Sequence, residues 1–81
     1  LDEEEIRQKE KEKEEELRQR TVHLLLDFRL DYVEHRLKTL QSEIAQAANE
    51  PDKMMQLMSE FKYMQVIRNE LARRLGSEIL I

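Results

Sequence analysis

The stretch LDFRLDYVEHRLKTLQSEIAQA, residues 26–47, decides the fold of this chain. Apolar residues recur in it at alternating steps of four and three: Leu26, Leu30, Val33, Leu37, Leu40, Ile44 and Ala47. This spacing keeps all of these side chains on one stripe of an α-helix. Because such a stripe is unstable in water, it needs a second helix packed along it.

A competing pattern crosses the start of this stretch. Every second residue from 24 to 32 is apolar, which is the period of a β-strand: Leu24, Leu26, Phe28, Leu30 and Tyr32. We predict a helix, because the heptad pattern covers three repeats and strong helix formers flank it. On a helix, Leu25, Phe28 and Tyr32 then form a second apolar strip beside the main one.

Residues 49–52, Asn-Glu-Pro-Asp, interrupt the helical pattern. Proline lacks the N–H that an interior helix bond needs and disfavours helical backbone at Glu50. It suits the first turn of a following helix, where Asp52 meets the positive end of the helix dipole. We therefore predict a helix over 21–48, a turn at 49–52 and an antiparallel helix over 52–75.

The second helix has its own apolar face. Its predicted core residues are Met54, Leu57, Met58, Phe61, Met64, Ile67, Leu71 and Leu75. Gly76 follows at the position where a helix commonly ends in a left-handed residue. Residues 76–81 are then expected to form a short apolar tail.

Residues 1–20 are a run of charges with only three apolar residues, so they carry no stripe to bury. Opposite charges stand four apart in several places, Glu3 and Arg7 among them, which favours a solvated helix. We predict a charged helical stalk or linker that continues into residues 21–48, rather than a new helix start at Thr21. An acidic interaction tail is the alternative reading.

Composition limits the classes of function. The 81 residues carry a net charge of −4 and no cysteine. The acidic balance argues against a nucleic-acid-binding module, and we expect no direct nucleic-acid binding. We expect neither a membrane-spanning segment nor a signal peptide, and the missing cysteines fit a reducing compartment. Because it begins at Leu1 with charges following at once, we interpret it as a fragment of a larger protein, with Ile81 as its natural C-terminus.

Residues able to perform chemistry are scattered. His23 and His35 stand twelve apart, about three helical turns, so they cannot share a metal ion. Asp27 and Asp31 share a helix face, but Arg29 and Arg36 are near enough for salt pairing to be expected instead of acid–base catalysis. We predict a non-catalytic fragment with no cofactor and no metal.

Two helices cannot cover every apolar strip in this sequence. Beyond the main stripes, Leu25, Phe28 and Tyr32 remain uncovered on the first helix, and Met55, Tyr63 and Val66 on the second. We therefore expect the isolated chain to self-associate as a homo-oligomer and a partner surface to cover these strips in the full protein.

Residues 25–81 resemble a known family. The pattern Asp31-Tyr32-Val33, the acidic break at 49–52 and above all the ending IRNELARRLG, residues 67–76, look like the C-terminal helicase-binding domain of bacterial DNA primase (DnaG type). The charge run is similar to the connecting helix that precedes that hairpin. The resemblance implies a bacterial, cytoplasmic parent protein that is a DNA-directed RNA polymerase, whose zinc-binding and catalytic domains are absent from this chain.

Within that family, the hairpin docks on the N-terminal domains of the replicative helicase (DnaB type) and brings primase to the replication fork. Carried onto this chain, the contact would fall on the last helix and the tail. The residues expected to bind the helicase are Tyr63, Val66, Glu70, Arg73, Arg74, Ile79, Leu80 and Ile81. For Arg73 and Arg74 the alternative role is compensation of the helix dipole, and for the tail it is packing over the open end of the hairpin. A structural coiled-coil segment of an unrelated protein, serving only oligomerisation, is the alternative function.

Overall fold

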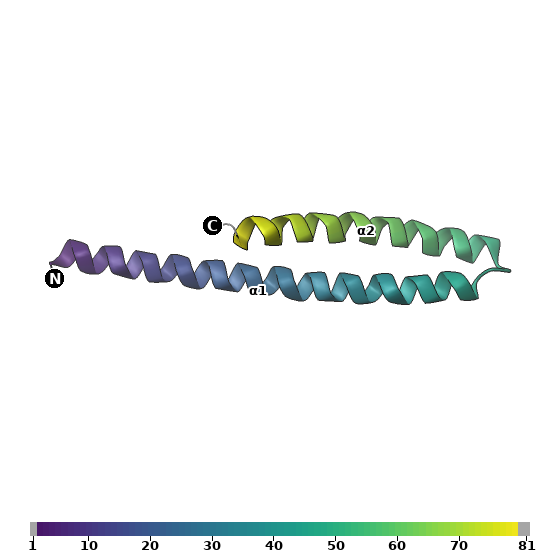
Figure 1. The fold of residues 1–81 in the computed structure, drawn as a ribbon, viewed down its shortest axis with the longest axis horizontal. Coiled ribbons are helices and arrows are strands. Elements are labelled where there is room, and N and C mark those ends of the chain that lie inside the picture. The colour runs from purple at the N-terminus through teal and green to yellow at the C-terminus, as the bar shows by residue number, and fades with distance from the viewer. Residues whose placement is uncertain (1, 80–81) are drawn as a thin grey trace.

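The computed structural model describes the backbone of residues 2–79 and the side chains of residues 2–77. Two helices, α1 (Glu3–Gln46) and α2 (Pro51–Ile79), lie side by side as an antiparallel hairpin (Figure 1). The described residues contain no strand, so the predicted all-α hairpin is confirmed and the strand reading of residues 24–32 is excluded.

The first helix is a single unbroken element of 44 residues. Asp2 caps it, accepting a hydrogen bond from the backbone N–H of Glu5 at 2.8 Å. At the predicted junction between stalk and hairpin, the Thr21 hydroxyl donates to the Leu17 carbonyl at 2.8 Å, and the helix continues. Its N-terminal part runs beyond the end of α2, and the described residues span 73 Å (Figure 1).

The turn begins earlier than predicted. α1 ends at Gln46 instead of residue 48, and the Ala47 N–H closes its last turn on the carbonyls of Glu43 and Ile44. The Glu50 N–H then donates to the Ala47 carbonyl at 3.0 Å, and the Glu50 carbonyl accepts from Met54 at 2.9 Å. This leaves Pro51 at the first position of α2, where its missing N–H costs nothing.

The prediction for the end of α2 is wrong. We predicted a last helical residue at 75, a left-handed Gly76 and a tail over 76–81, but α2 continues through Gly76 to Ile79. No glycine has a positive φ, so Gly76 keeps ordinary helical backbone. A left-handed Gly76 would direct the chain out of the helix, whereas residues 77–79 continue the helix. Leu80 and Ile81 lie outside the described residues.

The core follows the heptad stripe. Leu40 and Ala47 are fully buried, Leu26, Val33 and Leu37 are buried, and Leu30 and Ile44 are partly buried. Across from them on α2, Leu71 is buried and the other partly buried apolar residues are Met54, Leu57, Phe61, Met64, Ile67 and Leu75. Met58, which we predicted in the core, is 48% exposed, because the four-and-three spacing through Leu57 and Phe61 leaves it beside the stripe.

Candidate partner-binding surface

The outer face of α2 carries an uncovered apolar pair. Tyr63 and Val66 stand three residues apart on one side of the helix, and their exposed fractions are 64% and 68%. Both belong to the predicted partner-binding set, and the structure places both away from the hairpin core. Met55, 70% exposed, lies about three turns before Val66 on the same face.

A group of charged side chains follows this pair toward the C-terminus, and two of them, Arg73 and Arg74, also line a depression beside Leu26 of α1. Arg73 donates two hydrogen bonds to the Glu70 carboxylate, from Nη2 at 2.6 Å and from Nε at 3.1 Å. Arg74 donates one more from Nε at 3.3 Å. The Arg73 hydrogen bond is the main cause that lowers the pKa of Glu70. Glu70, Arg73 and Arg74 thus form one exposed ionic cluster beside the apolar pair. We call the pair and the cluster together the α2 outer patch: Tyr63, Val66, Glu70, Arg73 and Arg74.

The remaining predicted residues are at the C-terminus. Ile79 is the last residue of α2, so it extends the helix instead of belonging to a tail. Leu80 and Ile81 fall outside the described residues, and their part in the surface stays a prediction.

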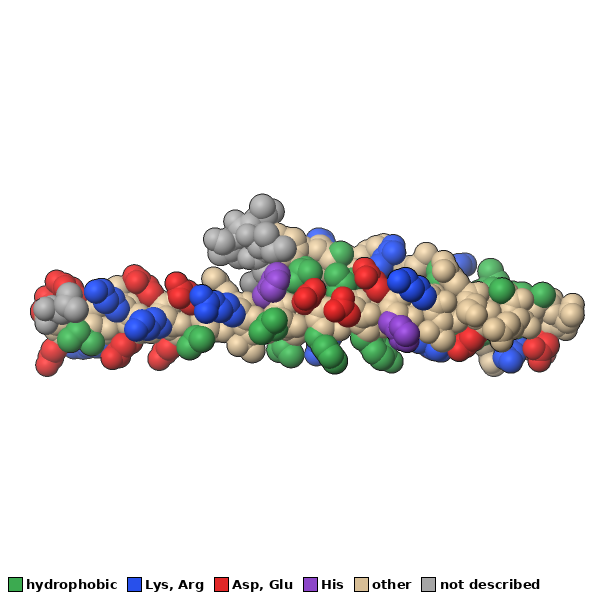
Figure 2. All heavy atoms as spheres, turned by 60° about the horizontal axis from the view of Figure 1, so that its bottom comes forward, with side chains coloured by type: hydrophobic (Ala, Val, Ile, Leu, Met, Phe, Trp, Pro, Cys, Tyr) green, Lys and Arg blue, Asp and Glu red, His purple; other side chains and the backbone are tan. Residues whose placement is uncertain are grey.

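A second uncovered surface lies on α1. We define the α1 outer strip as Leu17, Leu24, Leu25, Phe28 and Tyr32, whose exposed fractions run from 56% for Leu25 to 75% for Phe28. Figure 2 shows hydrophobic side chains gathered along one edge of the middle of α1. At about 100° per residue, the strip is centred roughly 140° around the helix from the buried stripe. It therefore lies behind α1, turned away from α2, rather than beside the stripe as predicted.

The N-terminal half of this strip is not among the predicted apolar strips. Leu17 stands alone within the charge run, and Leu24 belongs to the strand-like alternation of residues 24–32. The signal that would have found them is the continuation of the Phe28 face by steps of four and three, back through Leu24 and Thr21 to Leu17.

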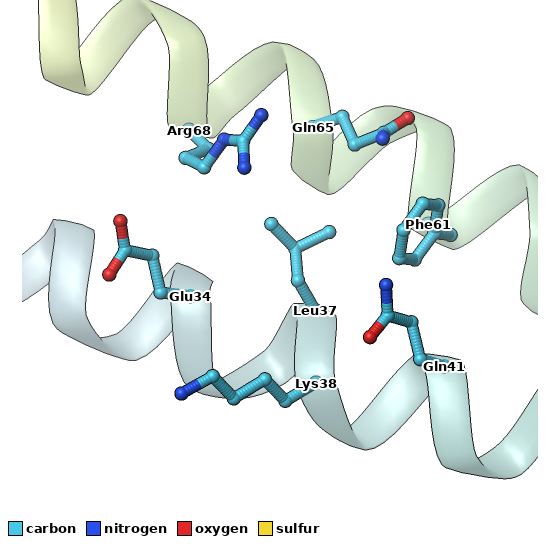
Figure 3. A pocket seen from close by; sticks show the side chains of 7 residues that line it. All are labelled: Glu34, Leu37, Lys38, Gln41, Phe61, Gln65 and Arg68. Atoms are coloured by element: carbon cyan, nitrogen blue, oxygen red, sulfur yellow. The ribbon is translucent and has the colours of Figure 1, made fainter.

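The groove between the helices has a depression with a mostly polar lining. A shallow depression along one side of the hairpin is lined by Glu34, Leu37, Lys38, Gln41, Phe61, Gln65 and Arg68. In Figure 3, Leu37 points from α1 toward α2 between Phe61 and Arg68, with polar side chains around it. Because Leu37 is only 7% exposed, the depression is the polar margin of the core.

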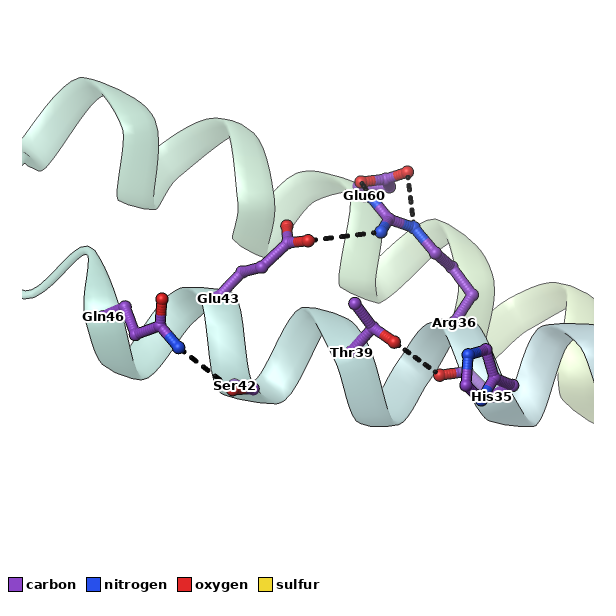
Figure 4. A network of polar contacts seen from close by, with 7 residues as sticks. All are labelled: His35, Arg36, Thr39, Ser42, Glu43, Gln46 and Glu60. Atoms are coloured by element: carbon purple, nitrogen blue, oxygen red, sulfur yellow. Dashed lines mark hydrogen bonds and ion pairs between the residues drawn. The ribbon is translucent and has the colours of Figure 1, made fainter.

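The described acidic and histidine side chains form no metal-binding group. No group of three or more His, Cys, Asp or Glu residues able to hold a metal ion occurs within the described part of the chain. Asp27 and Asp31 remain exposed on α1. Arg36, which we expected to screen them, reaches instead to Glu60 on α2 and Glu43 on its own helix (Figure 4).

Comparison with known proteins identifies a family. A family described as a domain of unknown function (DUF8430) matches residues 2–79, nearly the whole chain. The chain belongs to this family. No curated protein and no solved structure matches it.

The family match covers both helices. This DUF8430 domain therefore includes the charged part of α1 that projects past α2. None of the described helices is long and apolar enough to cross a membrane. The uncovered apolar residues on both helices point to contacts with another molecule, either a partner or a second copy.

Proposed function

We propose that this DUF8430 domain is the helicase-binding hairpin of a DnaG-type primase. It would be a non-catalytic adaptor that docks on the N-terminal domains of a DnaB-type helicase and brings the primase to the replication fork. Two features support this proposal: the ending IRNELARRLG over residues 67–76, and a helical hairpin on a long charged helix, the architecture that the resemblance implies.

The observation that carries the proposal is the exposure of Tyr63 and Val66 on the outer face of α2. A helix that presents apolar side chains at such spacing suits packing into a groove of a partner. Tyrosine is frequently an energetic anchor of interfaces, because a large rigid ring is buried at little entropic cost. An apolar pair bordered by charged groups also has the usual anatomy of an interface, with an apolar centre and a polar rim.

The ionic cluster supplies directional contacts. Arg74 gives Glu70 a single N–H donor, and a guanidinium has five. The other donors of Arg73 and Arg74 can therefore reach carboxylates of the helicase domain without breaking their contact with Glu70. Because exposed ion pairs contribute little on their own, we assign affinity mainly to Tyr63 and Val66 and orientation to the arginines.

A calorimetric titration of the chain against the N-terminal domain of a DnaB-type helicase tests the proposal. We expect Tyr63→Ala and Val66→Ala each to weaken binding about tenfold or more, with unchanged helicity, because both side chains lie outside the hairpin core. Met58→Ala, an exposed apolar residue of the same helix off this face, is the matched control and should bind normally.

Deleting residues 77–81 tests the C-terminal end of the predicted contact and should also weaken binding. If binding survives both substitutions and the deletion, the contact face is wrong. If the folded chain does not bind the helicase domain at all, the adaptor proposal fails and the coiled-coil alternative replaces it.

A further inference from the structure

The α1 outer strip is an apolar surface that neither the hairpin nor the proposed helicase contact uses. Each of its five large side chains is more than half exposed. Since the strip is turned away from α2, another helix can pack along it without disturbing the core.

The order of residues along this face is symmetric. Leu17 and Tyr32, Thr21 and Phe28, and Leu24 and Leu25 are three pairs whose midpoints all fall between Leu24 and Leu25. A second α1 laid antiparallel about that midpoint puts the smaller Leu17 and Thr21 of one copy opposite Tyr32 and Phe28 of the other, and Leu24 opposite Leu25. A two-fold contact requires such a self-complementary surface.

The charges that flank the strip fit the same arrangement. Arg20 lies on one flank of the strip, and Asp27 and Asp31 lie on that same flank toward the C-terminus. In an antiparallel helix pair like flanks face each other, so Arg20 of one copy meets Asp27 and Asp31 of the other, twice by symmetry. All three residues are exposed in the single chain, and no ion pair with Asp27 or Asp31 is found within the described residues.

We propose that a second copy of this chain covers the α1 outer strip, forming an antiparallel two-fold dimer centred between Leu24 and Leu25. The five side chains offer on the order of 600 Å² of apolar surface per protomer, near the roughly 800 Å² per partner of a standard interface. The dimer is thus expected to be of moderate affinity and to leave both α2 outer patches free. It does not rest on the helicase proposal.

Sedimentation equilibrium of the chain from about 1 to 200 µM tests the association. We expect a concentration-dependent dimer and, for Phe28→Glu, a monomer with unchanged helicity, because Phe28 is 75% exposed and lies outside the core. Met55→Glu, an equally polar change at a 70% exposed site on α2, is the matched control and should still dimerise. A wild-type monomer throughout this range, or a Phe28→Glu dimer, would overturn the proposal.

Cysteine crosslinking tests the direction of the helices, since the natural chain has no cysteine. Leu17→Cys and Tyr32→Cys chains mixed in equal amounts should form a mixed disulfide dimer on mild oxidation, and Leu17→Cys alone should not crosslink. Efficient crosslinking of Leu17→Cys with itself would instead show a parallel pair and contradict the antiparallel arrangement.

Discussion

Arg36 of α1 and Glu60 of α2 form a two-pronged ion pair across the hairpin, with Nη2 to Oε2 at 2.7 Å and Nε to Oε1 at 3.3 Å (Figure 4). The third guanidinium nitrogen, Nη1, donates to Glu43 at 3.4 Å. The bond to Glu60 is the main cause that raises the pKa of Arg36. Because a guanidinium that holds a carboxylate with two N–H donors is a directional contact, this pair favours the observed alignment of α2 along α1.

Removing the ion pair should loosen the hairpin modestly. We expect Arg36→Ala to lower the midpoint of thermal unfolding by a few degrees, and Arg29→Ala, at an exposed site on the same helix, to leave it nearly unchanged. Circular dichroism melts of Arg36→Ala, Glu60→Ala and the double variant form a cycle. Strictly additive losses in that cycle would show that the pair contributes no coupling to stability.

The centre of the core should be the most sensitive site in the chain. Leu40 has no exposed surface, so Leu40→Ala removes buried apolar atoms and leaves a cavity that two helices can only partly close. We expect a loss of about 2–5 kcal/mol in the free energy of unfolding, measured by urea denaturation. Met55→Ala, at a 70% exposed site, should change it by less than about 0.5 kcal/mol. Similar losses at the two sites would contradict the position of the core.

The close approach of the helices at the turn depends on a small residue. Ala47 is fully buried where α1 ends, while its neighbour Ala48 is exposed in the turn. Ala47→Leu has no space for its extra atoms, and we expect it to destabilise the hairpin by about 1–3 kcal/mol in urea denaturation. Ala48→Leu places the same larger side chain in solvent and should leave the free energy of unfolding nearly unchanged. A neutral Ala47→Leu would mean that the helices splay at this end.

The fold was predictable because one pattern determined it. The heptad from Leu26 to Ala47 defines a single buried face, and Pro51 marks the only place where the backbone cannot continue as a helix. The end of α2 was not predictable in this way. Glycine permits a left-handed residue but does not require one. The local sequence around Gly76 therefore does not decide whether the helix stops or continues.

The candidate surfaces were predictable only in part. The exposure of Tyr63, Val66 and Phe28 followed from their spacing relative to the stripe. The cross-helix role of Arg36 did not, because Asp31 and Glu60 are both plausible partners until the alignment of α2 along α1 is known. Sequence spacing reports neighbours within one helix, whereas that alignment depends on how two separate faces pack.

Gly76 offers a direct test of where α2 ends. The glycine has helical backbone, and a Cβ built there meets nothing within 4 Å. Gly76→Ala should therefore stabilise the last turns of α2, by up to about 1 kcal/mol, because alanine loses less backbone entropy than glycine in a helix. Amide hydrogen exchange over residues 72–77 should slow. A destabilised variant with faster exchange would place Gly76 in a left-handed helix end after all.

The Glu70 cluster makes a prediction about pH. Arg73 chiefly, and Arg74 to a lesser degree, hold the pKa of Glu70 below its ordinary value of 4.5. Since the folded pKa is the lower one, the stabilisation that Glu70 contributes is present above about pH 4.5 and is lost as the pH falls through the folded value. Carbon-detected NMR titration of the Glu70 carboxyl should give a midpoint below 4.5 that rises in Arg73→Ala and rises less in Arg74→Ala. Equal shifts in the two variants, or none in Arg73→Ala, would contradict the two-pronged contact between Arg73 and Glu70 as the dominant interaction at this end of α2.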